Sequence, residues 1–280
     1  MFKHLKWALL ALTVYTGKAQ AQMDSYIHSG EFGFSVGTGH YFGDLNTSAA
    51  LDRPKLAAGI FFRKQISNYI GVRLHANYAQ LGYSDVFSKN ETQRRRNLSF
   101  NSNVYELGVS GDFNFFKFNP GWEGYNFTPY VSLGVSMFTF DPFAYLGGER
   151  YFLRELGTEG QGSSLYPDRQ PYSTTAFAIP LGVGVKYALN EKMNFFAELS
   201  YRFTNTDYLD DVSTTYAPDA FPLLPNGNPS PAQLLSDRSY ETGPLIGTKG
   251  RQRGNSLQND AFATLQFGVS FNLSSYKCPR

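Results

Sequence analysis

Residues 70–78 read Ile-Gly-Val-Arg-Leu-His-Ala-Asn-Tyr, so apolar side chains alternate with small or polar ones. Successive side chains of a β-strand point to opposite faces, and this period of two therefore predicts a strand with one apolar and one polar face. Residues 263–273 read Ala-Thr-Leu-Gln-Phe-Gly-Val-Ser-Phe-Asn-Leu and repeat the pattern close to the C-terminus. One such segment is weak evidence, so the number of repeats decides the fold.

Eight segments of this kind follow one another along the chain, at residues 31–41, 56–63, 70–78, 105–115, 131–137, 177–186, 195–203 and 263–273. A tilted strand of about ten residues is long enough to cross a bilayer. An open sheet would leave unpaired backbone groups in lipid, whereas a closed barrel pairs them all. The sequence therefore predicts an all-β protein, an eight-stranded antiparallel transmembrane β-barrel over about residues 30–273.

The connections alternate in length. The shorter set is 65–69, 117–129 and 188–193, and the longer set is 43–53, 84–103, 141–174 and 206–260. Short turns on one side and long loops on the other are typical of outer-membrane barrels, with the short turns in the periplasm. We therefore expect a bacterial outer-membrane protein with both termini in the periplasm and long extracellular loops.

The first 21 residues indicate export. Lys3, His4 and Lys6 precede a short apolar run, and Ala19-Gln20-Ala21 fits a cleavage site. This order is typical of a secretory signal peptide, which leaves residues 22–280 as the mature chain, with a short tail at 274–280. Without the three lysines of the signal, 22 basic residues face 23 acidic ones, so the charge gives no indication of nucleic-acid binding.

Aromatic residues make up 16% of the chain and gather near the ends of the predicted strands. Aromatic side chains favour the two interfaces of a membrane. We expect an interfacial girdle from Tyr41, Phe42, Tyr69, Phe115, Phe116, Tyr130, Phe138, Phe140, Tyr187 and Tyr201.

The inward-facing positions of the predicted strands carry four acidic and four basic residues. They are Glu31, Arg63, Arg73, Glu106, Asp112, Lys186, Glu198 and Arg202. Eight strands enclose a space that side chains just fill, and unpaired charges there are costly. The balance predicts an ion-paired, closed lumen rather than a selective pore.

No residue pattern points to catalysis or to a cofactor. His40 with Asp44 is the one acid–base pair near a loop, and His75 is expected inside the barrel. The run Asp207-Tyr208-Leu209-Asp210-Asp211 offers carboxylates, but it lacks the spacing and glycine of a calcium loop, which favours turn chemistry over a metal site. Residues 94–96, three arginines, fit either contact with lipopolysaccharide phosphates or a solvated loop tip.

Two strings of sequence resemble the PorG family of outer-membrane barrels from Bacteroidota. They are residues 39–46, Gly-His-Tyr-Phe-Gly-Asp-Leu-Asn, and residues 206–213, Thr-Asp-Tyr-Leu-Asp-Asp-Val-Ser, and the chain ends in Ser-Tyr-Lys-Cys-Pro-Arg. The family-like loop residues are Tyr41, Phe42, Gly43, Asp44, Asp207, Tyr208, Asp210 and Asp211. The resemblance implies a non-enzymatic component of the type IX protein secretion system, which exports adhesins in gliding relatives. It also implies that the barrel anchors a periplasmic ring of the lipoprotein PorK and its partner PorN.

An anchor needs a surface on the periplasmic side. The candidates are Pro120, Trp122 and Tyr125 in the longest of the short turns, and Tyr276, Lys277 and Cys278 in the tail. Trp122 fits a partner contact and a lipid headgroup contact equally well. The lone Cys278 fits a free thiol or an intermolecular bridge. A small solute channel and a surface adhesin acting through the long loops remain alternative functions.

Overall fold

The computed structural model describes residues 28–274, in which eight strands form a closed antiparallel barrel. The barrel strands are β1 (His28–Phe42), β2 (Lys55–Gln65), β3 (Ile70–Ser84), β4 (Ser99–Asn114), β5 (Phe127–Thr139), β8 (Thr175–Ala188), β9 (Met193–Thr204) and β10 (Ala261–Ser274). Each strand pairs with its neighbour in sequence, β1 pairs with β10, and the β3–β4 pairing completes the ring. The predicted fold and strand number are confirmed.

The outside of the barrel is a continuous apolar band. Side chains of one parity are largely exposed, as for Val36 at 58%, Val135 at 67% and Phe177 at 62%. The other parity is buried, so each strand follows the predicted alternation. An apolar band of this extent is unusual for a water-soluble surface and is suited to hydrocarbon. The fold is therefore a barrel of the outer-membrane type.

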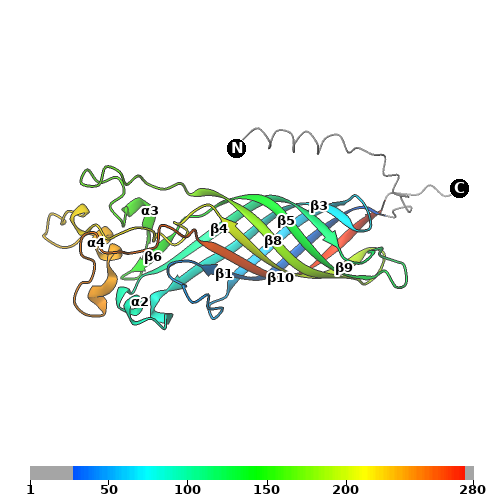
Figure 1. Cartoon of the computed structure of the whole chain (residues 1–280), viewed down its shortest axis with the longest axis horizontal. Helices are drawn as coiled ribbons and strands as arrows, with labels where there is room; N and C mark the ends of the chain where they lie inside the picture. Colours follow the sequence, from blue (N-terminus) through cyan, green and yellow to red (C-terminus); the bar gives the residue numbers. More distant parts are fainter. Residues whose placement is uncertain (1–27, 275–280) are drawn as a thin grey trace, which may run out of the picture.

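The connections sort to opposite ends of the barrel (Figure 1). The turns 66–69, 115–126 and 189–192 form what we call the short-turn end. The segments 43–54, 85–98, 140–174 and 205–260 form the long-loop end. The long-loop segments contain η1 (Asp85–Phe87), α2 (Glu91–Arg96), β6 (Phe143–Leu146), β7 (Glu149–Phe152), α3 (Leu153–Leu156), η2 (Pro218–Ala220), α4 (Pro231–Ser236) and η3 (Arg238–Glu241). Within residues 28–274, no helix is long and apolar enough to cross a membrane.

The strands run further toward the long-loop end than their sequence pattern predicts, and the lumen changes character there. Leu81, Phe100 and Phe262 point inward and are almost fully buried. They pack with Leu209 and Leu235 from the last loop in one hydrophobic core. The long-loop end is therefore a folded, apolar-cored body, because burying these side chains stabilises the loops that cover them.

This inner core corrects part of the expected girdle. Tyr41, Tyr130, Phe138 and Phe140 are each 3% exposed or less and lie inside the barrel or under the loops. Their positions in the alternation put these side chains on the inward face of the barrel. The girdle was predicted from nearness to a strand end, which does not tell the inward face from the outward one. Tyr69, Phe115, Phe116 and Tyr187 are 44–55% exposed on the outer face, where a girdle requires them. The predicted signal peptide, together with Tyr276, Lys277 and Cys278, lies outside the described residues.

Candidate functional site

The middle of the lumen is occupied by buried ion pairs. Glu31 of β1 lies directly opposite Arg63 of β2, and 2.7 Å separates the Glu31 Oε2 and Arg63 Nη1 atoms. Arg63 also lies opposite Arg73 of β3, a juxtaposition of like charges. Asp112 of β4 resolves it, since its carboxylate is 2.5 Å from Arg63 Nε and 3.4 Å from Arg73 Nη2.

Two further pairs cross the lumen. Arg73 Nη1 is 2.6 Å from Glu198 Oε2, and Arg202 Nη2 is 3.1 Å from Glu106 Oε2. Seven of the eight charged residues expected inside the barrel are therefore ion-paired. The eighth, Lys186, is buried and has no hydrogen-bond partner among residues 28–274, and its ammonium lies 4.6 Å from the ring centroid of Tyr130.

The space left between these side chains is a cavity of about 20 Å³. That is room for roughly one water molecule, so side chains nearly fill this part of the lumen. His75 lines the same cavity. His40 contacts Thr38, and the Asp44 carboxylate is bonded to the Asn255 N–H. The described contacts therefore do not join these two residues, which were considered from the sequence only as an alternative to a non-catalytic barrel.

The long-loop end holds a second set of buried polar contacts. Arg96 of α2 forms a bidentate pair with Asp85, with distances of 2.7 and 2.8 Å. The same guanidinium donates to the backbone carbonyls of Asp44, at 3.0 Å, and Arg253, at 2.6 Å. Planar, multidentate contacts of this kind suit arginine. One side chain thus joins the segments 43–54, 85–98 and 205–260.

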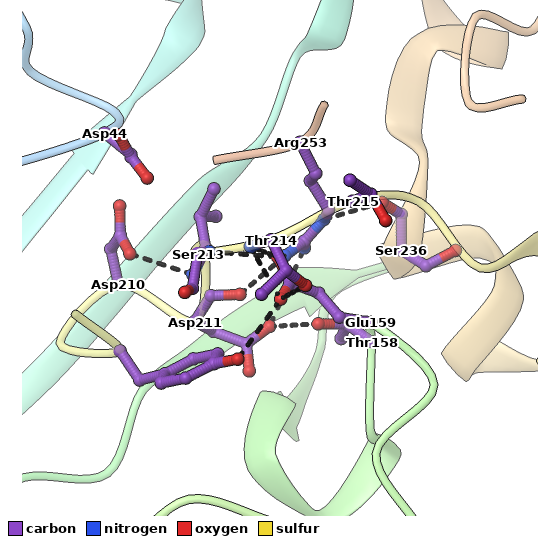
Figure 2. A network of polar contacts seen from close by, with 12 residues as sticks. Asp44, Thr158, Glu159, Asp210, Asp211, Ser213, Thr214, Thr215, Ser236 and Arg253 are labelled. Carbon is purple, nitrogen blue, oxygen red and sulfur yellow. Dashed lines mark hydrogen bonds and ion pairs between the residues drawn. The ribbon is translucent and has the colours of Figure 1, made fainter. Parts of the chain in front are cut away.

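Glu159 joins the segment 140–174 to the last loop (Figure 2). Its carboxylate is fully buried and accepts the backbone N–H groups of Ser213, at 2.9 Å, and Thr214, at 3.0 and 3.1 Å. The Thr214 hydroxyl donates to it at 2.6 Å, and Arg253 Nη1 lies 3.1 Å away. Charge-assisted bonds from several donors compensate for burying the carboxylate.

Asp211 sits beside this cluster. Its carboxylate accepts hydrogen bonds from the hydroxyls of Thr158 and, at 2.8 Å, Tyr172, while Arg253 Nη1 donates to its backbone carbonyl at 2.5 Å. The backbone of Asp211 is left-handed, with φ of 67°. Aspartate tolerates this conformation better than most residues because its short side chain bonds locally. Burial raises the pKa of Asp211 to about 6.

The two family-like strings meet through Tyr41. Its hydroxyl lies 2.5 Å from Asp210 Oδ2 and 3.0 Å from Asp260 Oδ1. A phenol has one proton, so it cannot donate fully to both carboxylates. Burial, followed by the charge of Asp44, raises the pKa of Asp210 well above its ordinary value. Burial and the nearby Asp210 do the same to Asp260.

Two glycines allow this close approach. A Cβ at Gly43 would lie 1.8 Å from Asp260 Oδ1 and 2.1 Å from the Tyr41 hydroxyl. A Cβ at Gly254 would lie 2.4 Å from Asp44 Oδ2 and 2.5 Å from the Ser213 nitrogen. Both positions therefore require a residue without a side chain.

The remaining family-like residues surround the same cluster. The Asp44 carboxylate accepts the backbone N–H of Asn255 at 2.6 Å. Tyr208 stacks on Tyr172 with ring centroids 4.5 Å apart. Asp207 is half-buried, and burial raises its pKa to about 7. Phe42 contacts Tyr201 on the outer face, with ring centroids 5.7 Å apart.

The Asp-rich run does not form a metal centre in the described part of the chain, where no group of three or more acidic, histidine or cysteine residues is arranged to hold an ion. The three arginines are also structural in part. Arg95 donates to the carbonyls of Ser239 and Pro244, at 3.2 and 2.5 Å. With Arg96 buried, only Arg94 resembles a solvated loop tip, so neither expectation for the cluster is right as a whole.

An open cleft of about 670 Å³ lies beside this cluster. Its walls come from the segment 43–49, from α2 with the residues before it, from residues 251–259 and from the outer aromatic pair Phe42 and Tyr201. Sequence reasoning missed this cleft, together with Asp85, Glu159, Arg253 and Asp260, because loop residues show no periodicity.

The short-turn end carries the other candidate residues. In the turn 115–126, Trp122 is 56% and Tyr125 is 40% exposed. Backbone hydrogen bonds from Asn119 to Tyr125 and from Trp122 to Asn119 close the turn. Pro120 is buried within it, so this residue, expected to contact a partner, is not available at the surface.

Comparison with known proteins gives a family without an assigned activity. A model described as a domain of unknown function (DUF6089) matches residues 6–229. The chain belongs to the DUF6089 family. No curated protein sequence matches it.

Solved structures similar to the chain include three bacterial proteins at low identity. Neisserial surface protein A is 12% identical with a TM-score of 0.44, covering 87% of this chain and 97% of that one. The attachment invasion locus protein Ail of Yersinia pestis is 10% identical with a TM-score of 0.40, covering 88% and 99%. The outer membrane protein OprG from Pseudomonas aeruginosa is 12% identical with a TM-score of 0.40, covering 89% and 99%.

Proposed function

We propose that this chain is a non-enzymatic outer-membrane barrel that acts as a binding scaffold of the surface-adhesin type, not as a channel. The observation that carries the proposal is the cross-linked long-loop end. Arg96, Glu159 and Arg253 join all four long loops through buried contacts into one fixed surface. A surface ordered before binding loses less entropy when a partner docks.

The ion-paired lumen supports the same proposal. In the middle of the lumen, paired side chains leave a cavity of only about 20 Å³, and this supports a barrel that does not conduct. We assign the long-loop end to the cell exterior and the short-turn end to the periplasm, because outer-membrane barrels have that asymmetry. The fixed loop surface would then face the medium and the sugars of lipopolysaccharide.

Two measurements test the scaffold proposal. The purified barrel in planar bilayers is expected to show no ohmic conductance. A photo-reactive amino acid in place of Leu245, which is 67% exposed on the last loop, is expected to cross-link a surface ligand or partner on intact cells. The matched position is Val135, on the lipid-facing band, where only lipid adducts are expected. A steady ion current together with no cross-links from the loop would contradict the scaffold proposal and favour a channel.

A second proposal is the anchor of the type IX secretion system, with PorK and PorN as periplasmic partners. It is supported by the resemblance of the two loop strings to PorG and by the turn 115–126. That turn is longer than 66–69 or 189–192 at the same end and exposes Trp122. Exposed tryptophan at the centre of a surface is a frequent binding hot spot.

Affinity purification in mild detergent tests the anchor. Ring proteins are expected to co-purify with the barrel, and deletion of the gene is expected to block cargo export without changing general permeability. Intact export in a clean deletion would contradict the anchor while leaving the scaffold proposal in place.

A further inference from the structure

The cleft at the long-loop end has the size of a small-molecule site. Its volume of about 670 Å³ falls within the range of roughly 300–1,000 Å³ that ligand pockets occupy. It opens between three chain segments that are distant in sequence, 43–49, 90–96 and 251–259. The question is which ligand chemistry its walls fit.

Hydrogen bonds join the three segments that line the cleft. Asp44 accepts the Asn255 N–H at 2.6 Å, and Arg96 donates to the carbonyls of Asp44 and Arg253. Gln93 adds a hydrogen bond of 3.1 Å to the same Asp44 carbonyl. These contacts keep the three segments at a fixed separation, so the cleft exists before any ligand arrives.

Most charged groups of the lining are engaged in contacts within the protein. Arg96 and Arg253 are buried and paired with Asp85 and Glu159, and Asp44 is committed to a backbone N–H. Of the ionisable lining residues, Arg251 alone is largely exposed. A site for a polyanion such as nucleic acid or a phosphate cluster would present several free cations. The lining therefore favours a ligand that is mainly neutral.

The exposed lining is rich in amides and hydroxyls, namely those of Asn90, Thr92, Gln252, Gln258 and Asn259. A side-chain amide donates two hydrogen bonds and accepts through its carbonyl, and a hydroxyl does both. The chemical complement of such a surface is a ligand that offers donors and acceptors in alternation without charge. Sugars, with a hydroxyl on almost every carbon, have this pattern.

The aromatic wall adds a second feature. Phe42 ends β1 and Tyr201 lies in β9, with their rings tilted by 31° and both on the outward parity. The electron-rich face of an aromatic ring attracts the positively polarised C–H groups of a sugar ring. Aromatic residues at this level of a barrel also mark the membrane boundary. With the long-loop end assigned to the cell exterior, the cleft would open near the level at which the sugars of a lipid-linked glycan leave the membrane.

We infer that this cleft binds neutral sugar units of a glycan. The inference rests on the proposed scaffold function and names its ligand class. The sugars can come from a glycolipid in the surrounding leaflet or from a free polysaccharide, and both sources present the same hydroxyl pattern to the amides.

The test uses the full chain, purified in detergent, and saturation-transfer NMR with titration. The probes are four neutral homo-oligosaccharides, namely maltoheptaose, cellohexaose, mannohexaose and chitohexaose, and the oligosaccharide released from the lipopolysaccharide of the bacterium that makes this protein. A sulfated heparin hexasaccharide serves for comparison. The variant carries Gln252→Ala, Gln258→Ala and Asn259→Ala, which remove exposed amides without touching the buried contacts. The matched control carries Gln170→Ala and Asn228→Ala, two exposed amides outside the cleft.

At least one unsulfated probe is expected to bind, and the triple variant is expected to weaken that binding by about tenfold or more because several hydrogen bonds are lost. The control is expected to bind as the wild type does. Binding of the released oligosaccharide indicates the glycolipid source, and binding of one of the four neutral homo-oligosaccharides alone indicates a free glycan.

Two results would overturn the inference. One is that no unsulfated probe binds at about 10 mM, whether or not the sulfated probe binds. The other is equal binding by the triple variant and the wild type. If a photo-reactive residue at position 245 still cross-links a partner after such a result, the scaffold proposal stands with another class of ligand. If neither sugar binding nor loop cross-linking is observed, the scaffold proposal is contradicted as well.

Discussion

Glu159 and Arg253, 94 residues apart in the sequence, form an ion pair at the centre of the long-loop end, with 3.1 Å between Oε1 and Nη1. Their side chains are 0% and 2% exposed. The pair connects the loop between β5 and β8 with the loop between β9 and β10, and Thr158, Asp211, Ser213 and Thr214 lie around it (Figure 2).

Replacing Arg253 by alanine is expected to loosen the whole long-loop end. The change leaves Glu159 and Asp211 buried without their cation, and breaking a buried pair from one side costs about 3–5 kcal/mol. Hydrogen exchange of residues 205–260 measures the effect, with faster exchange expected there and unchanged exchange in the β-strands. The control is Lys249→Ala, which removes an exposed ion pair with Asp219 and is expected to change nothing measurable.

Gly43→Ala tests the close approach of the two family-like strings. The new Cβ would fall 1.8 Å from Asp260 Oδ1. The other oxygen of this carboxylate, Oδ2, accepts the Leu209 N–H at 2.9 Å, so the carboxylate cannot shift without straining that bond. We expect the Tyr41–Asp210 contact to open and the last loop to become protease-sensitive. Gly111→Ala is the matched change, because its nearest neighbour would be a carbonyl oxygen 4.0 Å away. Equal protease resistance of both variants would contradict this account of Gly43.

The long-loop end is expected to be more stable in acid than at neutral pH. Burial raises the pKa of Asp211 to about 6 and of Asp207 to about 7, against an ordinary value of 3.8. Between about pH 4 and 7 the unfolded loop therefore releases protons that the folded loop keeps, so rising pH favours the unfolded loop. The Asp210–Asp260 pair acts in the same direction.

Hydrogen exchange at pH 5 and pH 8, corrected for intrinsic rates, measures this dependence. Asp260→Asn is expected to flatten it, because asparagine cannot acquire the charge that Asp210 opposes. A loop end that is better protected at pH 8 than at pH 5 would reverse the assigned sign.

The barrel was predictable from the sequence because its information is local. The alternation of apolar and polar residues along each strand, as in 70–78 and 263–273, predicts which side chains face lipid. The same alternation in the other strands places Arg63 and Glu198, like Arg73, inside the barrel without knowledge of their partners. The pairing of Arg73 with Glu198, 125 residues apart, depends on barrel closure and could not be read from either segment. The sequence did contain a signal for the longer strands. Along β3 the inward-facing residues change from the polar Asn77 to the apolar Leu81 and the aromatic Tyr83, which indicates a buried core beyond the predicted strand end.

The loop cluster was beyond sequence reasoning for a different reason. Glu159 lies in a segment without periodicity, and its partners Ser213 and Thr214 bond through backbone N–H groups that any sequence carries. The strings around Tyr41 and Asp210 were recognisable by resemblance. Their contact with each other and with Asp260 required the fold.

The lumen pairs make a final prediction about folding. Arg63→Met removes the cation beside Glu31 and leaves that carboxylate buried with hydrogen bonds from uncharged groups alone, at Ser270 and Gln65. We expect this variant to fold poorly into detergent or lipid, as seen from a smaller heat-modifiable band on gels. The double change Glu31→Gln with Arg63→Met removes both charges and is expected to recover much of the folding, because an uncharged pair avoids the cost of one unpaired buried ion. A double variant that folds no better than Arg63→Met would show that the shape of the arginine, and not its charge, fills the lumen.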